Sequence, residues 1–227
     1  MNQDQIKERL SKRSAGEKAA EYVKDGMVVG LGTGSTVEYT IKKIAARIRE
    51  ENLRITGIPT SIATEKLARD EKIPLASLNE HPVVDLDIDG ADEVDGNFNL
   101  IKGGGGAHTR EKIVASASKE FIVVAGSSKK VSRLGNFPVP VEVLPLAVEF
   151  VKSELIKLSG NPKLRENFIT DNGNRILDTK FEIKNPKKLE VELNSIPGVV
   201  DNGIFAHRKP EKVIFADGDK IEILERR

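Results

Sequence analysis

The sequence predicts an α/β fold in which a Rossmann-like, mostly parallel sheet has helices on both faces and a ferredoxin-like α+β domain is inserted. Two observations support this prediction. Short apolar runs alternate with segments in which apolar residues recur at helical spacing, which is typical of βα units around a parallel sheet. After Gly126 the order changes to βαββαβ, which is the ferredoxin-like pattern.

The first half of the chain opens with a predicted helix over residues 5–24, and Gly26 stands just beyond it as a C-cap would. Further helices are expected over 37–51, 62–70 and 110–119, and strands over 27–31, 54–58, 83–89 and 121–125. Because helices separate these strands, we expect the strands to be parallel.

The insert is expected to consist of strand 139–143, helix 146–159, strands 164–169 and 175–183, helix 187–196 and strand 199–205. Two last strands, 212–216 and 220–224, are joined by the turn Asp217-Gly218-Asp219 and are expected to return to the first sheet. The predicted domains are therefore a Rossmann-like catalytic domain at 1–130, a ferredoxin-like insert at 131–206 and a return at 207–227.

The composition of the 227 residues excludes several classes of protein. With 36 basic and 35 acidic residues the net charge is only +1, so neither nucleic acid nor a membrane surface is expected as a partner. The absence of cysteine excludes a thiolate nucleophile and thiolate metal sites. No run approaches the about 18 apolar residues of a membrane span, and the N-terminus lacks a signal-peptide core, so we expect a cytoplasmic protein.

The segment 30–36 lies between a predicted strand and a predicted helix, and its sequence is GLGTGST. Backbone N–H groups and the helix dipole at such a turn favour an anion, and Ser35 and Thr36 add hydroxyl donors. Ser35 stands where a dinucleotide fingerprint needs glycine, and the loop lacks the lysine of a triphosphate-binding loop. The segment therefore favours a single phosphate group, with a plain tight turn as the alternative.

A second motif, at 83–93, reads VVDLDIDGADE and superficially matches the start of a calcium loop. Gly96 stands where that loop needs a bidentate glutamate, and alternating apolar residues place the early aspartates on a strand, so calcium is not expected. Asp89 and Asp92 come where the strand ends, which is where ligands bind in open α/β sheets. Both are candidate site residues, with ordinary turn chemistry as the alternative.

Four consecutive glycines mark the third motif, 101–112, whose sequence is IKGGGGAHTREK. Ordering four glycines costs much conformational entropy, so close approach of the backbone to a ligand explains them better than a plain turn. Lys102 is a candidate to stabilise an oxyanion. Glu111, in the first turn of the next helix, is a candidate base, or else a surface glutamate that complements the helix dipole.

Lys129 follows another predicted strand and is a candidate contact for phosphate or sugar oxygens, with a solvated basic turn as the alternative. The histidines, His81, His108 and His207, lack the spacing of a metal site, so no metal is expected. The expected partner is a small phosphorylated sugar.

Seven segments, taken in chain order, resemble the type A ribose-5-phosphate isomerase family. They are GLGTGST, DIDGADE, IKGGGGAHTREK, SSKKV, FPVPVEVLP, ITDNGN and IPGVVDNGIF. The resemblance implies an enzyme that interconverts D-ribose 5-phosphate and D-ribulose 5-phosphate, without a cofactor, in the non-oxidative pentose phosphate pathway. It also implies a homodimer or homotetramer. Gly106 and His108 depart from the family pattern, in which Ala and Leu are common at these positions.

The resemblance also implies roles for individual residues. Glu111 is the base that moves a proton between C1 and C2 through a cis-enediolate. Asp89 and Asp92 assist ring opening and proton transfer between O1 and O2, while Lys102 stabilises the enediolate oxygens. The substrate-binding residues that it implies are Thr33, Gly34, Ser35, Thr36, Asp89, Gly90, Ala91, Asp92, Lys102, Gly103, Gly104, Gly105 and Lys129.

Two other classes remain as alternatives. The sugar-phosphate sensor domain of a repressor has a similar fold, but only residues 1–26 precede the first predicted strand, which is too short for a preceding helix-turn-helix. The second alternative is another enzyme, either a related sugar-phosphate hydrolase or deaminase, or an acyl-CoA transferase. The paired aspartates argue against the transferase, because acyl transfer needs no pair of groups to move protons.

Overall fold

The computed structural model describes residues 3–226, and by internal packing the chain divides into two units. The first unit comprises Met1–Gly90, Ile113–Lys130 and Pro210–Arg227, and the second comprises Ala91–Lys112 and Val131–Lys209. Packing thus groups 91–112, which includes the glycine loop, with the second unit. The division into domains at 1–130, 131–206 and 207–227 stays a prediction.

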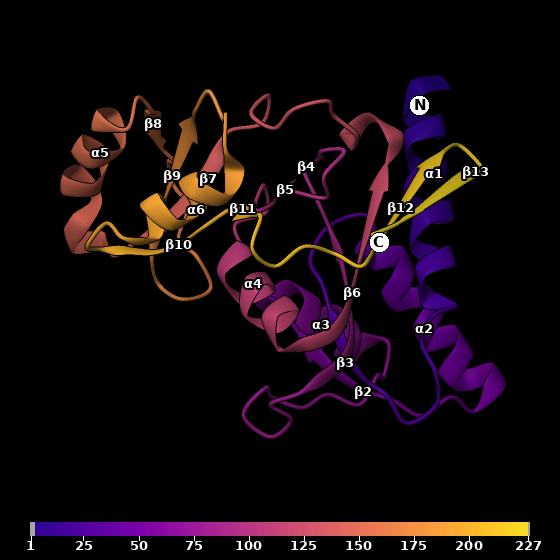
Figure 1. Ribbon diagram of the computed structural model, residues 1–227. Coiled ribbons are helices and arrows are strands. Elements are labelled where there is room, and N and C mark those ends of the chain that lie inside the picture. The colour runs from indigo at the N-terminus through magenta and orange to yellow at the C-terminus, as the bar shows by residue number, and fades with distance from the viewer. Residues whose placement is uncertain (1–2, 227) are drawn as a thin grey trace. The chain divides into compact units, whose positions relative to one another are not determined.

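The first unit contains a six-stranded sheet in the order β13-β12-β6-β3-β1-β2 (Figure 1). Its strands are β1 (Val28–Leu31), β2 (Thr56–Pro59), β3 (Val84–Gly90), β6 (Ser118–Gly126), β12 (Lys212–Asp217) and β13 (Lys220–Glu225). All neighbouring strands are parallel except β12 and β13, which form an antiparallel hairpin. The predicted mostly parallel sheet and the return of the last two strands to it are confirmed.

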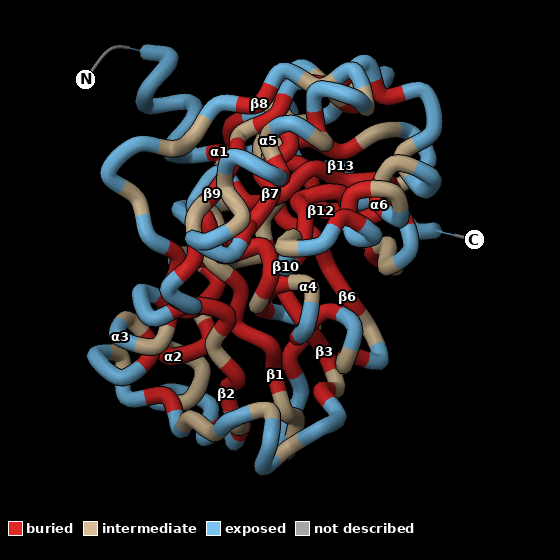
Figure 2. Tube along the Cα trace, turned by 90° about the vertical axis from the view of Figure 1, so that its left-hand side faces the viewer, coloured by how far each residue is buried: buried red, intermediate tan, exposed pale blue. Residues whose placement is uncertain are grey.

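Helices lie on both faces of this sheet. They are α1 (Gln3–Ala20), α2 (Val37–Glu51), α3 (Ile62–Asp70) and α4 (His108–Ala117). On one face Ile41 and Ile44 of α2 pack with Val29 of β1, because every second side chain of a strand points to the same face. On the other face Val114 of α4 packs with Val84 of β3. The central strands are accordingly buried (Figure 2).

The strand order creates a change of direction beside β1. From β1 the chain goes to β2 on one side and then returns to β3 on the other side of β1. The loop after β1 and the end of β3 are therefore neighbours at the carboxyl edge of the sheet. Ligands of open α/β sheets bind at such a switch point.

The second unit contains a four-stranded antiparallel sheet in the order β10-β7-β9-β8. Its elements are β7 (Val139–Val143), η2 (Pro145–Ala147), α5 (Val148–Lys157), β8 (Asn161–Leu164), β9 (Arg175–Lys180), α6 (Pro186–Asn194) and β10 (Val199–Asn202). The order βαββαβ with this pairing is the predicted ferredoxin-like arrangement. Its core includes Val141, Val151, Leu177 and Leu193.

Three very short strands of the second unit form another sheet, in the order β11-β5-β4. They are β4 (Glu93–Val94), β5 (Leu100–Ile101) and β11 (Ile204–Phe205). The sequence did not predict β4 and β5, because two residues are too few to show a period. Since β5 ends at Ile101, this sheet fixes the start of the glycine loop.

Several predicted elements are wrong in their bounds, the first helix and strand 164–169 among them. The first helix ends at Ala20 instead of residue 24, and N–H groups of the next residues bond three positions back, which tightens the chain. The predicted strand 164–169 is instead β8 at 161–164, since Asn167 has a left-handed φ of 52°. Among residues 3–226, the helices are too short or too polar to cross a membrane.

Candidate active site

Asp89 holds the loop after β1 against the end of β3. Its Oδ1 accepts hydrogen bonds from the backbone N–H of Thr33, at 3.0 Å, and of Gly90, at 2.7 Å. Its side chain also fills the space that a Cβ on Gly32 would need. The sequence therefore uses glycine at position 32 because a buried aspartate lies beside it, and two predicted site residues, Thr33 and Asp89, are in contact.

A cluster of hydroxyl groups fixes the side chain of Thr33. Its Oγ1 lies 2.8 Å from Oγ1 of Thr60 and from Oγ of Ser61, and 3.2 Å from Oγ1 of Thr64. Ser61 is also the N-cap of α3. Sequence reasoning missed these three partners. The available signal was a Thr-Ser pair directly after the strand that neighbours β1.

The remaining predicted residues of the first unit lie along the same carboxyl edge. Gly34, with φ of 119°, and Ser35 are exposed. Thr36 directly precedes α2, so backbone N–H groups at the start of that helix face the loop. Lys129 is half-buried at the end of η1 (Ser127–Lys129), which follows β6. This edge thus combines hydroxyls, helix N–H groups and a cation.

In the second unit Lys102 and Glu111 form a buried ion pair. The distance from Nζ to Oε2 is 3.1 Å, and the two side chains are only 2% and 5% exposed. The ring of Phe205 is also close, with its centroid 5.5 Å from Nζ. Charged groups are costly to bury, and each of these charges offsets part of the cost of burying the other. A carboxylate and a cation are thereby placed together away from water.

The glycine loop is shaped by contacts with the protein itself. Asp92 Oδ2 accepts the N–H of Gly104 at 2.8 Å. Gly103 has φ of 103°, and a Cβ there would lie 2.7 Å from Nδ1 of His108. The need for glycine at these positions therefore has a packing cause, in addition to the predicted approach of a ligand.

Glu142 of β7 holds the start of α4 through a buried network. This fully buried carboxylate accepts hydrogen bonds from Thr109 Oγ1, Thr170 Oγ1, and the side-chain amides of Asn172 and Asn174. Burial alone would raise the pKa of Glu142, but the four hydrogen bonds together lower it below its usual value. The sequence predicted a strand at 139–143 but no role for Glu142.

The residues on both sides of Glu111 are also held. Arg110 Nε donates to Oδ1 of Asn172 at 2.7 Å, and Lys112 Nζ lies 2.9 Å from Oδ1 of Asp201. Thr109 is bonded to Glu142, so the residues of α4 next to Glu111 all make side-chain contacts with other parts of the second unit. The Glu111 carboxylate is therefore presented by a rigid turn.

His108 is completely buried as the first residue of α4. Burial lowers the pKa of its imidazole from 6.5 to about 4, so the ring is neutral at pH 7. Its Nε2 lies 3.4 Å from the carbonyl oxygen of Asp201. Within residues 3–226, no group of three or more His, Asp or Glu side chains is placed to hold a metal ion.

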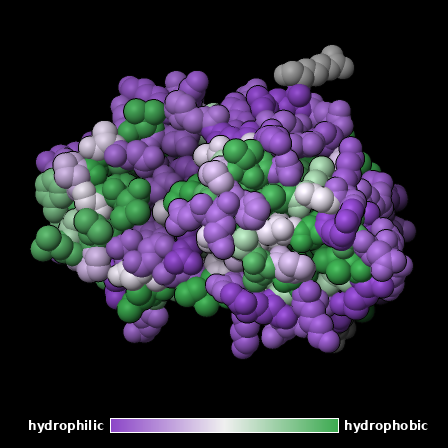
Figure 3. Space-filling view, turned by 90° about the horizontal axis from the view of Figure 1, so that it is seen from below, coloured by the Kyte–Doolittle hydropathy of each residue, from purple (hydrophilic) through white to green (hydrophobic). Residues whose placement is uncertain are grey.

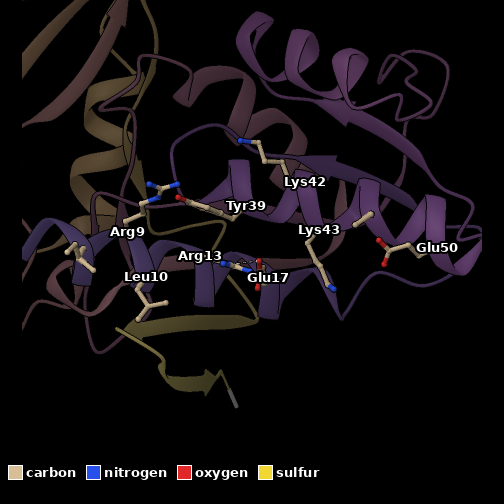
Figure 4. Close-up of a pocket in the computed structure, with 10 residues that line it drawn as sticks. Arg9, Leu10, Arg13, Glu17, Tyr39, Lys42, Lys43 and Glu50 are labelled. Carbon is tan, nitrogen blue, oxygen red and sulfur yellow. Dashed lines mark hydrogen bonds and ion pairs between the residues drawn. The ribbon is translucent and has the colours of Figure 1, made fainter. Parts of the chain in front are cut away.

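A groove between α1 and α2 is a separate feature of the first unit (Figure 4). Its lining includes the basic residues Arg9, Arg13, Lys42 and Lys43 and the ring of Tyr39. None of the predicted site residues lies among the described residues that line it.

Comparison with known proteins decides the family. The profile of the family described as ribose 5-phosphate isomerase A (phosphoriboisomerase A) matches residues 56–220, which is more than half of the chain. The chain belongs to this family. The predicted family, and with it the isomerase class of enzyme, is confirmed.

Relatives match over nearly their whole length. A ribose-5-phosphate isomerase A from Methanococcus aeolicus is 46% identical over 221 residues, or 94% of each chain. One from Acidithiobacillus ferrooxidans is 45% identical and covers 100% of both chains. The structure of ribose 5-phosphate isomerase A from Methanocaldococcus jannaschii has a TM-score of 0.92 at 43% identity, covering 99% of this chain and 100% of that one.

A further similar structure contains a ligand. It is a D-ribose-5-phosphate isomerase in complex with phospho-erythronic acid, with a TM-score of 0.93, 41% identity and complete coverage of both chains. The predicted α/β fold class therefore agrees with solved structures of the family as well as with the sheet topology.

Proposed function

We propose that this chain interconverts D-ribose 5-phosphate and D-ribulose 5-phosphate through a cis-enediolate. The observation that supports the chemistry most directly is the buried contact between Lys102 and Glu111. Removing a proton from the carbon beside a carbonyl requires a positioned base and a group that stabilises the negative charge on oxygen. This pair provides a carboxylate for the first task and a cation for the second.

In the proposed reaction, Glu111 takes the proton from C2 of the open-chain aldose. The C–H electrons form the C1–C2 double bond, and the carbonyl electrons move to O1, which gives the enediolate. Lys102 and the amides of Gly103 and Gly105 stabilise its oxygens, while Gly104, whose amide is bonded to Asp92, is proposed to contact the substrate. Return of the proton from Glu111 to C1, with proton transfer from O2 to O1, completes the ketose.

Asp89 and Asp92 are proposed to assist ring opening and the proton transfer between O1 and O2. Both side chains already accept backbone hydrogen bonds, from the loop after β1 and from the glycine loop respectively. These bonds hold the two carboxylates in fixed orientations. The two aspartates are separated by only Gly90 and Ala91, which are proposed to contact the substrate as well.

The phosphate group is proposed to bind at the loop after β1. Gly34, Ser35 and the first N–H groups of α2 are suited to an anion, and Lys129 adds positive charge at the same edge of the sheet. The Thr33 hydroxyl is already bonded to Thr60 and Ser61, and its backbone N–H to Asp89, so Thr33 is proposed to act by fixing the loop.

A homodimer or homotetramer in the cytoplasm is proposed as the working form. Apolar side chains around η2 and α5 are exposed, with Leu146 at 97% and Phe150 at 50%. Hydrophobic residues also gather at the left-hand end of the view in Figure 3, the side on which α5 lies in Figure 1. Such patches are typical of protein–protein contacts. Light scattering on the purified protein measures the assembly.

The activity is tested by incubating the purified, chelator-treated protein with ribose 5-phosphate and following ketose formation. Turnover is expected without added metal or cofactor, and ribose without phosphate is expected to react far more slowly. Replacement of Lys129 by Ala is expected to raise KM with a smaller effect on kcat, because it removes binding energy for the phosphosugar. No turnover of ribose 5-phosphate by the wild-type protein would contradict the proposal.

A further inference from the structure

Arg165, the residue after β8, donates hydrogen bonds to two successive carbonyl groups of the glycine loop. Its Nη2 lies 3.3 Å from the carbonyl oxygen of Gly103, and its Nη1 lies 3.2 Å from that of Gly104. Arg165 has no role in the proposed reaction, and it is not among the site residues that the sequence predicted. Its target is the backbone segment whose amides are proposed to face the enediolate.

A second residue fixes the guanidinium group. Asp178 of β9 accepts from Nε of Arg165 at 2.8 Å and from Nη2 at 2.6 Å, a bidentate ion pair. The two side chains are only 18% and 23% exposed. The guanidinium carbon also lies 5.2 Å from the ring centroid of Phe168. Arg165 is therefore a rigid donor, because a planar guanidinium held at one edge has little freedom at the other.

The direction of the peptide groups follows from these bonds. In a planar trans peptide the C=O and N–H point in opposite directions. Holding the carbonyls of Gly103 and Gly104 toward Arg165 therefore turns the N–H groups of Gly104 and Gly105 away from it. The Gly104 N–H does point away, toward Asp92, at 2.8 Å.

The positive charge of Arg165 also acts on these peptide groups. A cation at the carbonyl oxygen polarises the peptide group, which makes the N–H of the same peptide a stronger donor. The ring of Phe168 further holds the loop, since it fills the space that a Cβ on Gly106 would need. The segment from Arg165 to Phe168 thus supports the glycine loop from its carbonyl side.

We propose that Arg165, held by Asp178, is a positioning residue for the isomerisation, which orients and polarises the amide of Gly105 toward the enediolate oxygens and keeps the amide of Gly104 on Asp92. The inference rests on the proposed function. Arg165 itself does not touch the reacting atoms. Its contribution is made in the transition state, where negative charge on the sugar oxygens is largest.

The test compares Arg165→Lys with the matched control Arg133→Lys. Arg133 belongs to the same unit and also donates to a backbone carbonyl, that of Ile183 at 2.8 Å, but away from the glycine loop. A lysine keeps the positive charge of Arg165 and cannot bridge two carbonyls and a carboxylate at once. Both variants are assayed with ribose 5-phosphate, and inhibition by phospho-erythronic acid, whose carboxylate resembles the planar enediolate, is measured alongside.

For Arg165→Lys we expect kcat to fall by about tenfold to a hundredfold with little change in KM, and inhibition by phospho-erythronic acid to weaken by a similar factor. Arg133→Lys is expected to match the wild type. A second variant, Asp178→Asn, keeps the arginine but frees its orientation, and is expected to lose activity in the same direction, so the test stands if Arg165→Lys does not fold.

The outcomes separate the two proposals. If the wild type turns over ribose 5-phosphate and the folded Arg165→Lys or Asp178→Asn variant retains its kcat and inhibitor affinity, the positioning role is overturned and the isomerase function stands. An equal loss in Arg133→Lys also overturns it, because the effect is then not specific to the loop. If the wild type itself shows no turnover, the proposed function fails first and the positioning role fails with it.

Discussion

Nζ of Lys102 lies 3.1 Å from Oε2 of Glu111, and both side chains are almost completely buried. Replacing Lys102 by Met leaves a buried carboxylate without this cation and is expected to lower the free energy of unfolding by ~3–5 kcal/mol. The double variant Lys102→Met, Glu111→Gln removes both charges and is expected to be more stable than Lys102→Met alone. Urea unfolding of the wild type, both single variants and the double variant at pH 7 measures this coupling.

The exposed pair Lys7–Asp217 provides the matched control, with side chains 59% and 50% exposed. Its coupling, measured with Lys7→Met and Asp217→Asn, is expected to be much smaller because water screens both charges. Equal coupling in the two pairs would show that burial does not strengthen the contact between Lys102 and Glu111.

His108 makes stability depend on pH. Its folded-state pKa of about 4 lies below the ordinary 6.5, so the unfolded chain binds the proton more readily. Stability is therefore complete above pH 6.5 and falls between 6.5 and 4, by ~3 kcal/mol. His108→Leu is expected to remove this fall, and denaturant unfolding at several pH values measures it.

His207 is exposed and serves as the control for that experiment. His207→Leu is expected to leave the dependence of stability on pH as it is in the wild type. If His108→Leu retains the full loss of stability between pH 6.5 and 4, another group is responsible for it.

Glu142 is expected to stabilise the start of α4. Glu142→Gln replaces a carboxylate that accepts from Thr109, Thr170, Asn172 and Asn174 by an amide that cannot accept from all of them. A loss of ~2–4 kcal/mol in unfolding free energy at pH 7 is expected, with a lower kcat because Glu111 follows in the same turn. Because the folded-state pKa of Glu142 is lowered, its contribution is present above its ordinary pKa of 4.5 and declines at lower pH.

The exposed Glu182, with 72% of its side chain accessible, is the control for Glu142. Glu182→Gln is expected to change neither stability nor kcat measurably. Unchanged stability in Glu142→Gln would mean that the four hydrogen bonds do not favour the charged acceptor.

Asp89 combines a structural and a chemical role, which Asp89→Asn and Asp89→Ala separate. The Asn side chain still accepts from the Thr33 and Gly90 amides, so the loop is expected to stay in place while kcat falls by about a hundredfold. The Ala variant releases both amides and is expected to raise KM as well. Hydrogen exchange at Thr33 and steady-state kinetics measure the two effects, and equal KM values in the two variants would contradict the structural role.

Much of the fold was predictable because its signals are local. Helices 37–51 and 62–70 were predicted with the bounds that the structure has, since apolar spacing and the residues before each helix are distinctive. The short strands β4 and β5 were not, and β11 was predicted only as the end of one longer strand, 199–205, because pairing between residues 93–101 and 204–205 depends on contacts distant in sequence. Contacts distant in sequence also explain why residues 91–112 belong to the second unit.

The site was predictable where residues lie in one motif. Lys102 and Glu111 stand nine positions apart, and their contact follows from a loop that leads into a helix. The residues that support them come from distant segments, such as Glu142 and Arg165, and no local pattern relates these to the glycine loop. Only the folded chain brings such groups together.

Replacement of Glu111 by Gln tests the central claim most directly. Ribose 5-phosphate labelled with deuterium at C2 is incubated with the wild type, with Glu111→Gln and with Glu149→Gln, which alters a first-turn glutamate of another helix. The account predicts that Glu111→Gln loses label exchange by about a hundredfold to ten-thousandfold while calorimetry still detects binding, and that Glu149→Gln behaves as the wild type. Near-normal loss of the C2 label in Glu111→Gln would contradict the assignment of Glu111 as the base.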